Sequence, residues 1–214
     1  MMEFVFSEQE AVVHRAIRRH MGVRVQNDNM PVISKRGTRQ DLADCWSTLG
    51  YAMGVEIGTL RGDYAREILS RNPQCHLTCI DPWLIYDHSK ITEGMHHRNY
   101  DKTVKRLQPW LEEGRCDIVK RKSMEAVDMF DDESLDFVYI DGDHCFDAVA
   151  MDIIRWNAKV CPGGMIACHD YIPLRRGGVV QAVDAFTFCH NIRPWYVARE
   201  LLSTAFWVKP ETPY

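Results

Sequence analysis

The chain has 214 residues, of which 46% are hydrophobic and 26% are charged. This size and composition predict one globular domain with a full hydrophobic core. A net charge of −4 argues against nucleic acid as a partner, and because no apolar run approaches the ~20 residues of a membrane span, no membrane segment is expected.

The first 50 residues predict two helices. Ser7 and Glu10 form a capping-box pattern, and the apolar residues that follow recur at helical spacing. Residues 22–37 are expected to form a loop, after which Thr38 can cap a second helix. The expected buried stripe of this second helix comprises Leu42, Cys45 or Trp46, and Leu49. Because both helices precede the first core strand, they are predicted to form an N-terminal helical cap.

From residue 51 onward, predicted strands alternate with predicted helices. The expected strands are Met53–Ile57, Leu77–Asp81, Cys116–Lys120, Leu135–Asp141 and Met165–His169. The expected helices are Asp63–Ser70, Asn99–Leu111, Ser123–Met129, Asp147–Val160 and Val179–Cys189. A terminal hairpin is expected from Trp195–Leu201 and Thr204–Lys209. This alternation predicts an α/β fold in which five parallel strands and the hairpin form one Rossmann-like, seven-stranded sheet with one antiparallel strand.

The turn after the first expected strand carries an acid and two glycines in the pattern E-x-G-x-x-x-G. A dinucleotide site would have glycine at the position of Glu56, because its backbone must approach a pyrophosphate. A carboxylate at that position repels a pyrophosphate and suits an amino-acid ammonium group, which indicates S-adenosylmethionine (SAM) as the cofactor. Gly58 and Gly62 allow the backbone to come close, and Thr59 can hydrogen-bond the cofactor carboxylate. Asp81, at the end of the second expected strand, is expected to bind the ribose hydroxyls.

Two later segments carry a second signature, D-F-V-Y-I-D-G-D-H at residues 136–144 and P-G-G … H-D-Y at residues 162–171. Together with the first motif, this series resembles the class I SAM-dependent methyltransferases, in the small-molecule branch that includes macrolide-sugar O-methyltransferases and cephalosporin-hydroxylase-like proteins. The resemblance covers residues 53–208. It implies a methyltransferase domain over residues 51–214 that methylates a small-molecule acceptor, most simply at a hydroxyl. It also implies that Ser123 and Met124 contact the adenine.

The resemblance also implies how the acceptor is activated. In the metal-dependent O-methyltransferases, the acid at the Asp141 position and the pair after the fifth strand, here His169 and Asp170, hold a divalent ion. Hard Mg²⁺ prefers oxygen ligands, whereas an imidazole suits a transition metal, so a metal-free route stays open as well. In that route His144 is the expected general base, with an unperturbed pKa of about 6.5. The expected catalytic residues are therefore Asp141, His144 and His169.

Residues 82–98 form a long expected connection that contains Trp83, Tyr86 and three histidines. Connections of this length inside a compact domain are usually functional or disordered. Because the segment follows Asp81, it is interpreted as a lid over the cofactor or substrate, with a mobile surface loop as the alternative.

Three other interpretations of the sequence stay open. An NAD-dependent Rossmann enzyme would also have an acid at the position of Asp81, but it would have glycine at the position of Glu56. The acidic net charge of the chain argues against a nucleic-acid methyltransferase. A non-catalytic protein that binds SAM or a nucleotide with the same fold is the third. The eight cysteines contain no Cys-x-x-Cys pair, and Cys79, Cys116 and Cys168 lie in or beside apolar runs. With no signal-peptide pattern at the N-terminus, a reduced cytoplasmic protein is expected.

Overall fold

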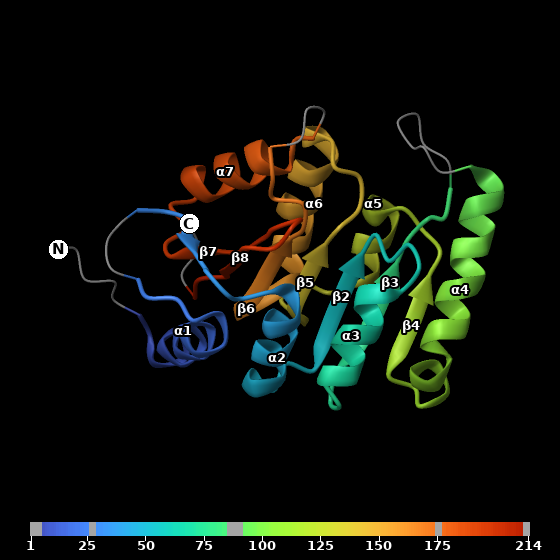
Figure 1. Ribbon diagram of the computed structural model, residues 1–214, viewed down its shortest axis with the longest axis horizontal. Helices are drawn as coiled ribbons and strands as arrows, with labels where there is room; N and C mark the ends of the chain where they lie inside the picture. Colours follow the sequence, from blue (N-terminus) through green and yellow to red (C-terminus); the bar gives the residue numbers. More distant parts are fainter. Residues whose placement is uncertain (1–5, 26–28, 85–91, 174–176, 212–214) are drawn as a thin grey trace.

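A computed structural model describes residues 6–25, 29–84, 92–173 and 177–211. The chain folds into a sheet between two layers of helices (Figure 1). The strands are β1 (Val32–Ile33), β2 (Met53–Ile57), β3 (His76–Ile80), β4 (Cys116–Val119), β5 (Leu135–Ile140), β6 (Val160–Cys168), β7 (Trp195–Ala198) and β8 (Thr204–Val208). The helices are α1 (Glu8–Met21), α2 (Arg39–Leu49), α3 (Asp63–Arg71), α4 (Glu93–Glu112), α5 (Ser123–Ala126), α6 (Phe146–Lys159) and α7 (Val179–Cys189), with a 3₁₀ turn at Val127–Met129.

The sheet has the strand order β1-β7-β8-β6-β5-β2-β3-β4. Strand β8 runs antiparallel to both of its neighbours, and the other pairs are parallel, so the α/β class, the Rossmann-like sheet and the terminal hairpin are confirmed. The described sheet has eight strands instead of the expected seven. The extra strand, β1, lies within residues 22–37 and pairs with β7. It was expected as loop because two residues are too few to show a strand's alternation of apolar and polar side chains.

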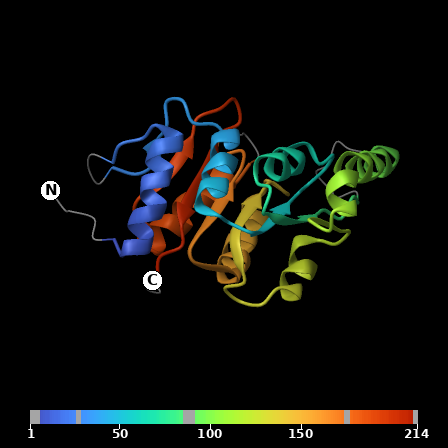
Figure 2. The ribbon, with the colours of Figure 1, turned by 90° about the horizontal axis from the view of Figure 1, so that it is seen from below.

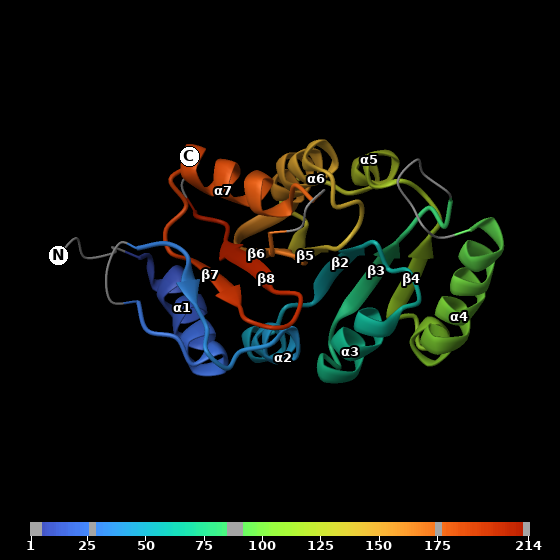
Figure 3. The same cartoon turned by 45° about the horizontal axis from the view of Figure 1, so that its top comes forward.

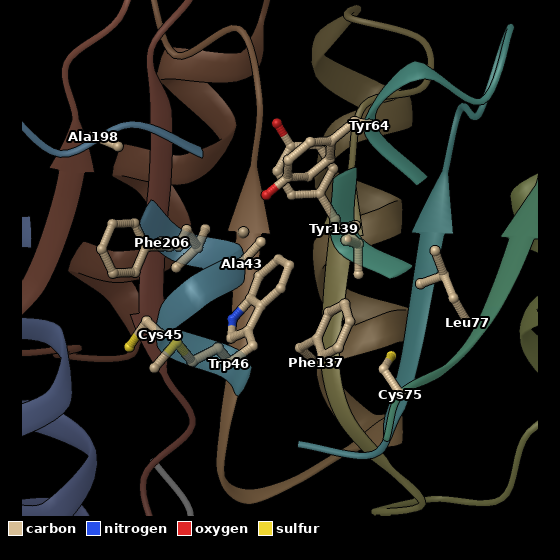
Figure 4. Packing of buried hydrophobic residues seen from close by; sticks show 14 of the residues in the cluster. Ala43, Cys45, Trp46, Tyr64, Cys75, Leu77, Phe137, Tyr139, Ala198 and Phe206 are labelled. Carbon is tan, nitrogen blue, oxygen red and sulfur yellow. The ribbon is translucent and has the colours of Figure 1, made fainter. Parts of the chain in front are cut away.

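Helices cover both faces of the sheet (Figures 2 and 3). Helices α1 to α4 bury their apolar sides against one face, and α5 to α7 against the other. On the first face, the ring of Trp46 from α2 stacks on Phe137 of β5 with centroids 4.0 Å apart. Figure 4 shows Tyr64 and Tyr139 side by side beyond this stack, with ring centroids 4.4 Å apart. The N-terminal helices therefore share a core with the sheet.

Local sequence signals explain where the first two helices begin. The Ser7 hydroxyl accepts the N–H of Glu10, and the Glu10 carboxylate accepts the N–H of Ser7. The same reciprocal pair links Thr38 and Asp41 at the start of α2. The expected N-capping residues of both helices, Ser7 and Thr38, are thus confirmed. The division of the chain into an N-terminal helical cap of residues 1–50 and a methyltransferase domain of residues 51–214 stays a prediction.

Helix α4 and strand β6 begin furthest from their expected first residues. Helix α4 begins at Glu93 instead of Asn99, so the connection expected over residues 82–98 is shorter, and His96 is buried within the helix. The first turn of α4 consists mainly of polar residues and Gly94, so it shows no apolar periodicity in the sequence. Residues 85–91, on which the lid hypothesis depends, lie outside the described residues. Strand β6 begins at Val160 and continues through Pro162 and Gly163.

No helix in the described part of the chain is long and apolar enough to cross a membrane.

Candidate active site

A cavity of about 970 Å³ opens at the carboxyl ends of β2, β3, β5 and β6. This is the edge where open α/β sheets bind their ligands, and the volume is typical of a cofactor site. The cavity lining includes every residue that the sequence proposed for the site except Gly62. Those lining residues are Glu56, Gly58, Thr59, Asp81, Ser123, Met124, Asp141, His144, His169 and Asp170.

The turn between β2 and α3 requires glycine at two positions. Gly58 has a φ of 85°, and a Cβ there would lie 2.0 Å from the backbone oxygen of Asp141. The glycine thus lets β2 and β5 end close together at the cavity. Gly62 has a φ of 70° at the start of α3 and packs toward Thr103 and Leu107 of α4. Its observed role is therefore in the turn.

Glu56 presents an unsatisfied carboxylate at the end of β2. Only 3% of the residue is exposed, and its Oε2 atom has no hydrogen-bond partner among the described residues. Burial raises the pKa of Glu56 to about 8, the nearby carboxylates of Asp141 and Asp81 add to the effect, and the neighbouring Thr59 hydroxyl acts against it. The Thr59 hydroxyl is itself buried and makes no well-directed hydrogen bond. A buried unpaired carboxyl is costly, so this position is prepared for a cationic ligand group.

Asp81 follows β3 and is held by two backbone N–H groups. Its Oδ2 accepts from Leu60 at 2.9 Å and its Oδ1 accepts from Trp83 at 2.7 Å. Burial raises the pKa of Asp81, while these two hydrogen bonds act in the opposite direction. Each carboxylate oxygen keeps a second lone pair, so the fixed side chain can still accept from two ligand hydroxyls.

A short hydrogen-bonded chain lines the opposite side of the cavity. The indole N–H of Trp156 donates to the Ser123 hydroxyl at 2.8 Å, and that hydroxyl donates to the Asp152 carboxylate. Asp152 is 5% exposed, and burial raises its pKa to about 6. The arrangement places an acceptor-rich edge beside Met124, which also lines the cavity.

Two imidazoles and two carboxylates converge at the ends of β5 and β6. His144 Nε2 lies 3.0 Å from Asp170 Oδ2 and 3.6 Å from Asp141 Oδ1. His169 Nδ1 lies 3.4 Å and 3.3 Å from the same two oxygens. Ligand atoms of Asp141, His144 and Asp170 all lie within 4.8 Å of one another. The sequence predicted the set Asp141, His169 and Asp170, and the structure brings His144 to the same two oxygens.

The carboxylates change the expected protonation of both histidines. Asp141 and Asp170 raise the pKa of His144 to about 10. Burial lowers the pKa of His169, but the same carboxylates outweigh it and raise the pKa to about 9. In turn, the imidazoles hold the pKa of Asp170 below its usual range despite burial. His144 thus differs from the expected unperturbed base, because a histidine with this pKa is already protonated at neutral pH. Its catalytic role stays a prediction.

Among the cavity-lining residues that the sequence did not propose for the site are Arg39 and Asp152. Asp152 lies three positions after Val149 and four before Trp156, on the buried stripe of α6, which was the available signal. Arg39 likewise lies in phase with the buried stripe of α2. A charged residue on an apolar stripe indicates either a paired core charge or a site.

The overall fold is similar to those of solved O-methyltransferases. An O-methyltransferase from Bacillus cereus, determined in complex with SAH, matches with a TM-score of 0.58 and 12% identity, over 96% of this chain and 93% of that one. The O-methyltransferase TomG from Streptomyces achromogenes, determined with SAM, matches with a TM-score of 0.58 and 15% identity, over 96% and 91%. At such identities the likeness concerns the fold alone.

The sequence itself identifies the family. Among curated proteins no relative matches the chain. The model of a protein family described as a methyltransferase domain matches residues 55–171, which is more than half of the chain and includes the ends of β2, β3, β5 and β6 that form the cavity. The chain therefore belongs to this methyltransferase-domain family.

Proposed function

We propose that the protein is a SAM-dependent methyltransferase that methylates a small molecule at a hydroxyl group. The observation that carries the proposal is the buried, unpartnered carboxylate of Glu56 at one end of a cofactor-sized cavity whose next strand ends in Asp81. The first group matches the ammonium of a methionine and the second matches a ribose diol. The SAM and SAH bound to the two solved O-methyltransferases support this choice of cofactor.

The remaining cavity residues suit the other parts of the cofactor. Ser123 and Met124 lie where an adenine edge and face can be met, and Asp152 adds an acceptor for the exocyclic amino group. The acceptor would then approach from the side of Asp141, His169 and Asp170. Methyl transfer from a sulfonium needs alignment and exclusion of water more than covalent catalysis, which a largely buried cavity supplies.

The four converging side chains also fit a divalent metal ion. The nitrogens His144 Nε2 and His169 Nδ1 are buried within ion-pair distance of two carboxylates, yet neither makes a well-directed hydrogen bond. Side chains that bind a metal ion are expected to lie close together in this way without hydrogen-bonding to one another. Because these four side chains mix imidazole nitrogen with carboxylate oxygen, they favour a transition metal such as Mn²⁺ or Fe²⁺ over Mg²⁺.

A bound metal would lower the pKa of the acceptor hydroxyl and orient it. Asp141, Asp170 and His144 would hold the ion, and His169 would either join them or fix the two carboxylates. The protein's own contribution is to position the acceptor oxygen in line with the methyl group.

Calorimetric titration with S-adenosylhomocysteine tests the cofactor assignment. Wild type should bind one equivalent, and Asp81→Ala should lose about 1.5–3 kcal/mol of binding free energy, as is typical of hydrogen bonds to charged groups. Asp101→Ala, an exposed acid on α4, is the matched control and should bind as wild type does. Absence of binding heat from folded wild type would overturn the proposal.

Metal binding can be measured separately from turnover. Wild type should bind one equivalent of Mn²⁺ by calorimetry, and Asp170→Asn should not, while both should bind S-adenosylhomocysteine. A fully active enzyme in the presence of EDTA would remove the metal from the proposal and leave alignment as the mechanism.

A further inference from the structure

Arg39 lines the cavity, although it belongs to the N-terminal helix α2 and lies outside the methyltransferase motifs. It is half-buried, and in the described part of the chain no carboxylate lies within 4.0 Å of its guanidinium. The groups that interact with its charge are the hydroxyls of Tyr139 and Tyr64 and the carboxylates of Glu200 and Glu56. A half-buried guanidinium without an ion-pair partner is unusual and needs an explanation.

Two neighbouring elements hold Arg39 at this position. Its backbone N–H donates to the Glu200 carboxylate at 2.6 Å, in the connection between β7 and β8. Its backbone carbonyl accepts from the Tyr64 hydroxyl of α3 at 2.7 Å. The guanidinium then lies over the Tyr64 ring, 5.0 Å from the centroid. The guanidinium also interacts with the Tyr139 hydroxyl. Because Glu200 accepts from the backbone N–H, the remaining N–H donors of the Arg39 side chain are available to another acceptor.

The guanidinium of Arg39 and the carboxyl of Glu56 line the same cavity. The positive charge of Arg39 lowers the pKa of Glu56, against the larger effect of burial. A cavity that carries one unpaired anion and one unpaired cation matches the two charges of an α-amino acid. A planar guanidinium is also the side chain best shaped to bind a carboxylate through two parallel hydrogen bonds.

We propose that Arg39 binds the α-carboxylate of the methionine portion of SAM while Glu56 binds its ammonium group, so that α2 supplies half of the amino-acid site. The inference rests on the proposed function, since it assigns a residue to the same cofactor. It also gives the N-terminal segment a role in cofactor selection. The other two lysine or arginine residues of the cavity lining suit this role less well, because Arg61 and Lys122 are exposed and Arg61 is paired with Asp63 at 3.3 Å.

Three ligands distinguish the binding of the ammonium group from the binding of the carboxylate. SAM carries both the ammonium and the carboxylate, decarboxylated SAM carries the ammonium alone, and 5′-methylthioadenosine carries neither. Calorimetry should be performed with each ligand on wild type, Arg39→Met, Arg39→Lys and Glu56→Gln. Arg36→Met removes an equivalent charge from an exposed residue nearby and is the matched control.

Arg39→Met should weaken SAM binding by about tenfold to a hundredfold, the range typical of a charged hydrogen-bonded pair, and leave the other two ligands within about twofold of wild type. Arg39→Lys should weaken SAM binding by a smaller factor than Arg39→Met does, and it should leave the affinity for the other two ligands unchanged. Glu56→Gln should weaken both SAM and decarboxylated SAM, but not methylthioadenosine. Arg36→Met should change none of the affinities.

Several outcomes would overturn the inference. Equal weakening of all three ligands would mean that Arg39 only supports the fold, and unchanged SAM affinity with a raised KM for the acceptor would assign it to an acceptor anion. Arg39→Lys, which keeps the charge, guards against a misfolded Met variant. Failure of wild type to bind SAM at all would instead reject the proposed function, and the inference with it.

Discussion

At the residue scale, the buried carboxyl of Glu56 shows how a ligand site conflicts with stability. Burial raises its pKa to about 8, above the value of about 4.3 in an unfolded chain. The unfolded state therefore ionises first, and the ligand-free fold loses stability as the pH rises from about 4.3 to about 8. A bound ammonium group would reverse this effect, because it favours the ionised carboxylate.

Glu56→Gln should consequently have opposite effects on stability and on binding. At pH 8 the ligand-free variant should unfold at a higher temperature than wild type, since an amide cannot ionise. Its affinity for S-adenosylhomocysteine should fall, and it should lose the increase of about tenfold that wild type gains between pH 6 and pH 7 as Glu56 gives up its proton. Differential scanning fluorimetry and calorimetry over pH 6–8 measure both effects. If Glu56→Gln lowered both the unfolding temperature and the affinity for S-adenosylhomocysteine, the role of Glu56 would be purely structural.

A second residue-scale prediction concerns Asp152. Its carboxylate, oriented by the Ser123 hydroxyl, can accept from the amino group of adenine but would repel a carbonyl oxygen at the same ring position. Wild type should bind S-adenosylhomocysteine more tightly than S-inosylhomocysteine, and Asp152→Asn should reduce this preference by about tenfold. Asp101→Asn, at an exposed position on α4 that does not line the cavity, is the comparison. Equal selectivity in the two variants would remove Asp152 from the adenine site.

At the element scale, α1 docks on β7 through a buried polar contact. His14 Nδ1 lies 2.8 Å from the Tyr196 hydroxyl, and burial lowers the pKa of His14 to about 4. The unfolded chain binds a proton at a pKa of about 6.5, whereas the folded chain does so only at about 4. This histidine therefore removes stability as the pH falls through that interval.

His14→Gln lacks this titration and can keep a hydrogen bond to Tyr196. The melting temperature of the variant, relative to wild type, should increase steadily as the pH is lowered from about 6.5 to about 4. Gln108→Ala, at an exposed position on α4 without a titratable group, should show a constant difference. If the His14 difference also stays constant, the histidine is not held neutral by the docking of α1.

Element boundaries were predicted well where a pattern is local and apolar. Strand β2 and helix α7 have the predicted bounds, because each consists of a continuous or periodic apolar run between glycines or polar residues. Helix α4 was predicted to begin six residues late, since its first turn is polar and makes few core contacts. Strand β1 was missed because pairing with β7, and not its own composition, makes it a strand.

At the scale of the whole molecule, the N-terminal helices complete the core on one face of the sheet (Figure 4). Leu42, Ala43, Cys45 and Trp46 of α2 are fully buried there. Truncating a single large core side chain costs about 3–5 kcal/mol, against a total stability of about 5–15 kcal/mol for a domain. The face could not remain exposed at that cost.

A fragment of residues 51–214 should therefore fail to unfold cooperatively, as followed by circular dichroism and size-exclusion chromatography. Trp46→Ala in the full chain should lower the free energy of unfolding by about 3–5 kcal/mol. Leu201→Ala, at a residue that is 93% exposed, should leave the free energy of unfolding almost unchanged. A 51–214 fragment that folds and binds S-adenosylhomocysteine would instead support the division into a cap and a separate domain.

The α/β class, the succession of the main strands along the chain and the turn between β2 and α3 follow from the amino-acid sequence alone. These features depend on periodicity and on residue types that lie close together along the chain, such as Glu56 and Gly58. The sequence also placed Asp81, Asp141 and Asp170 at one edge of the sheet, because the carboxyl ends of parallel strands meet there.

Only the tertiary structure decided which charges act on one another. Arg39 reaches the cavity because α2 packs on α3 and the sheet, and Asp152 reaches it because α6 covers the other face. The pKa of His144 depends on its distances to Asp141 and to Asp170, the second of which comes from another strand end. Burial and electrostatic interaction between residues far apart in the chain follow from packing, and no local pattern of residues contains that information.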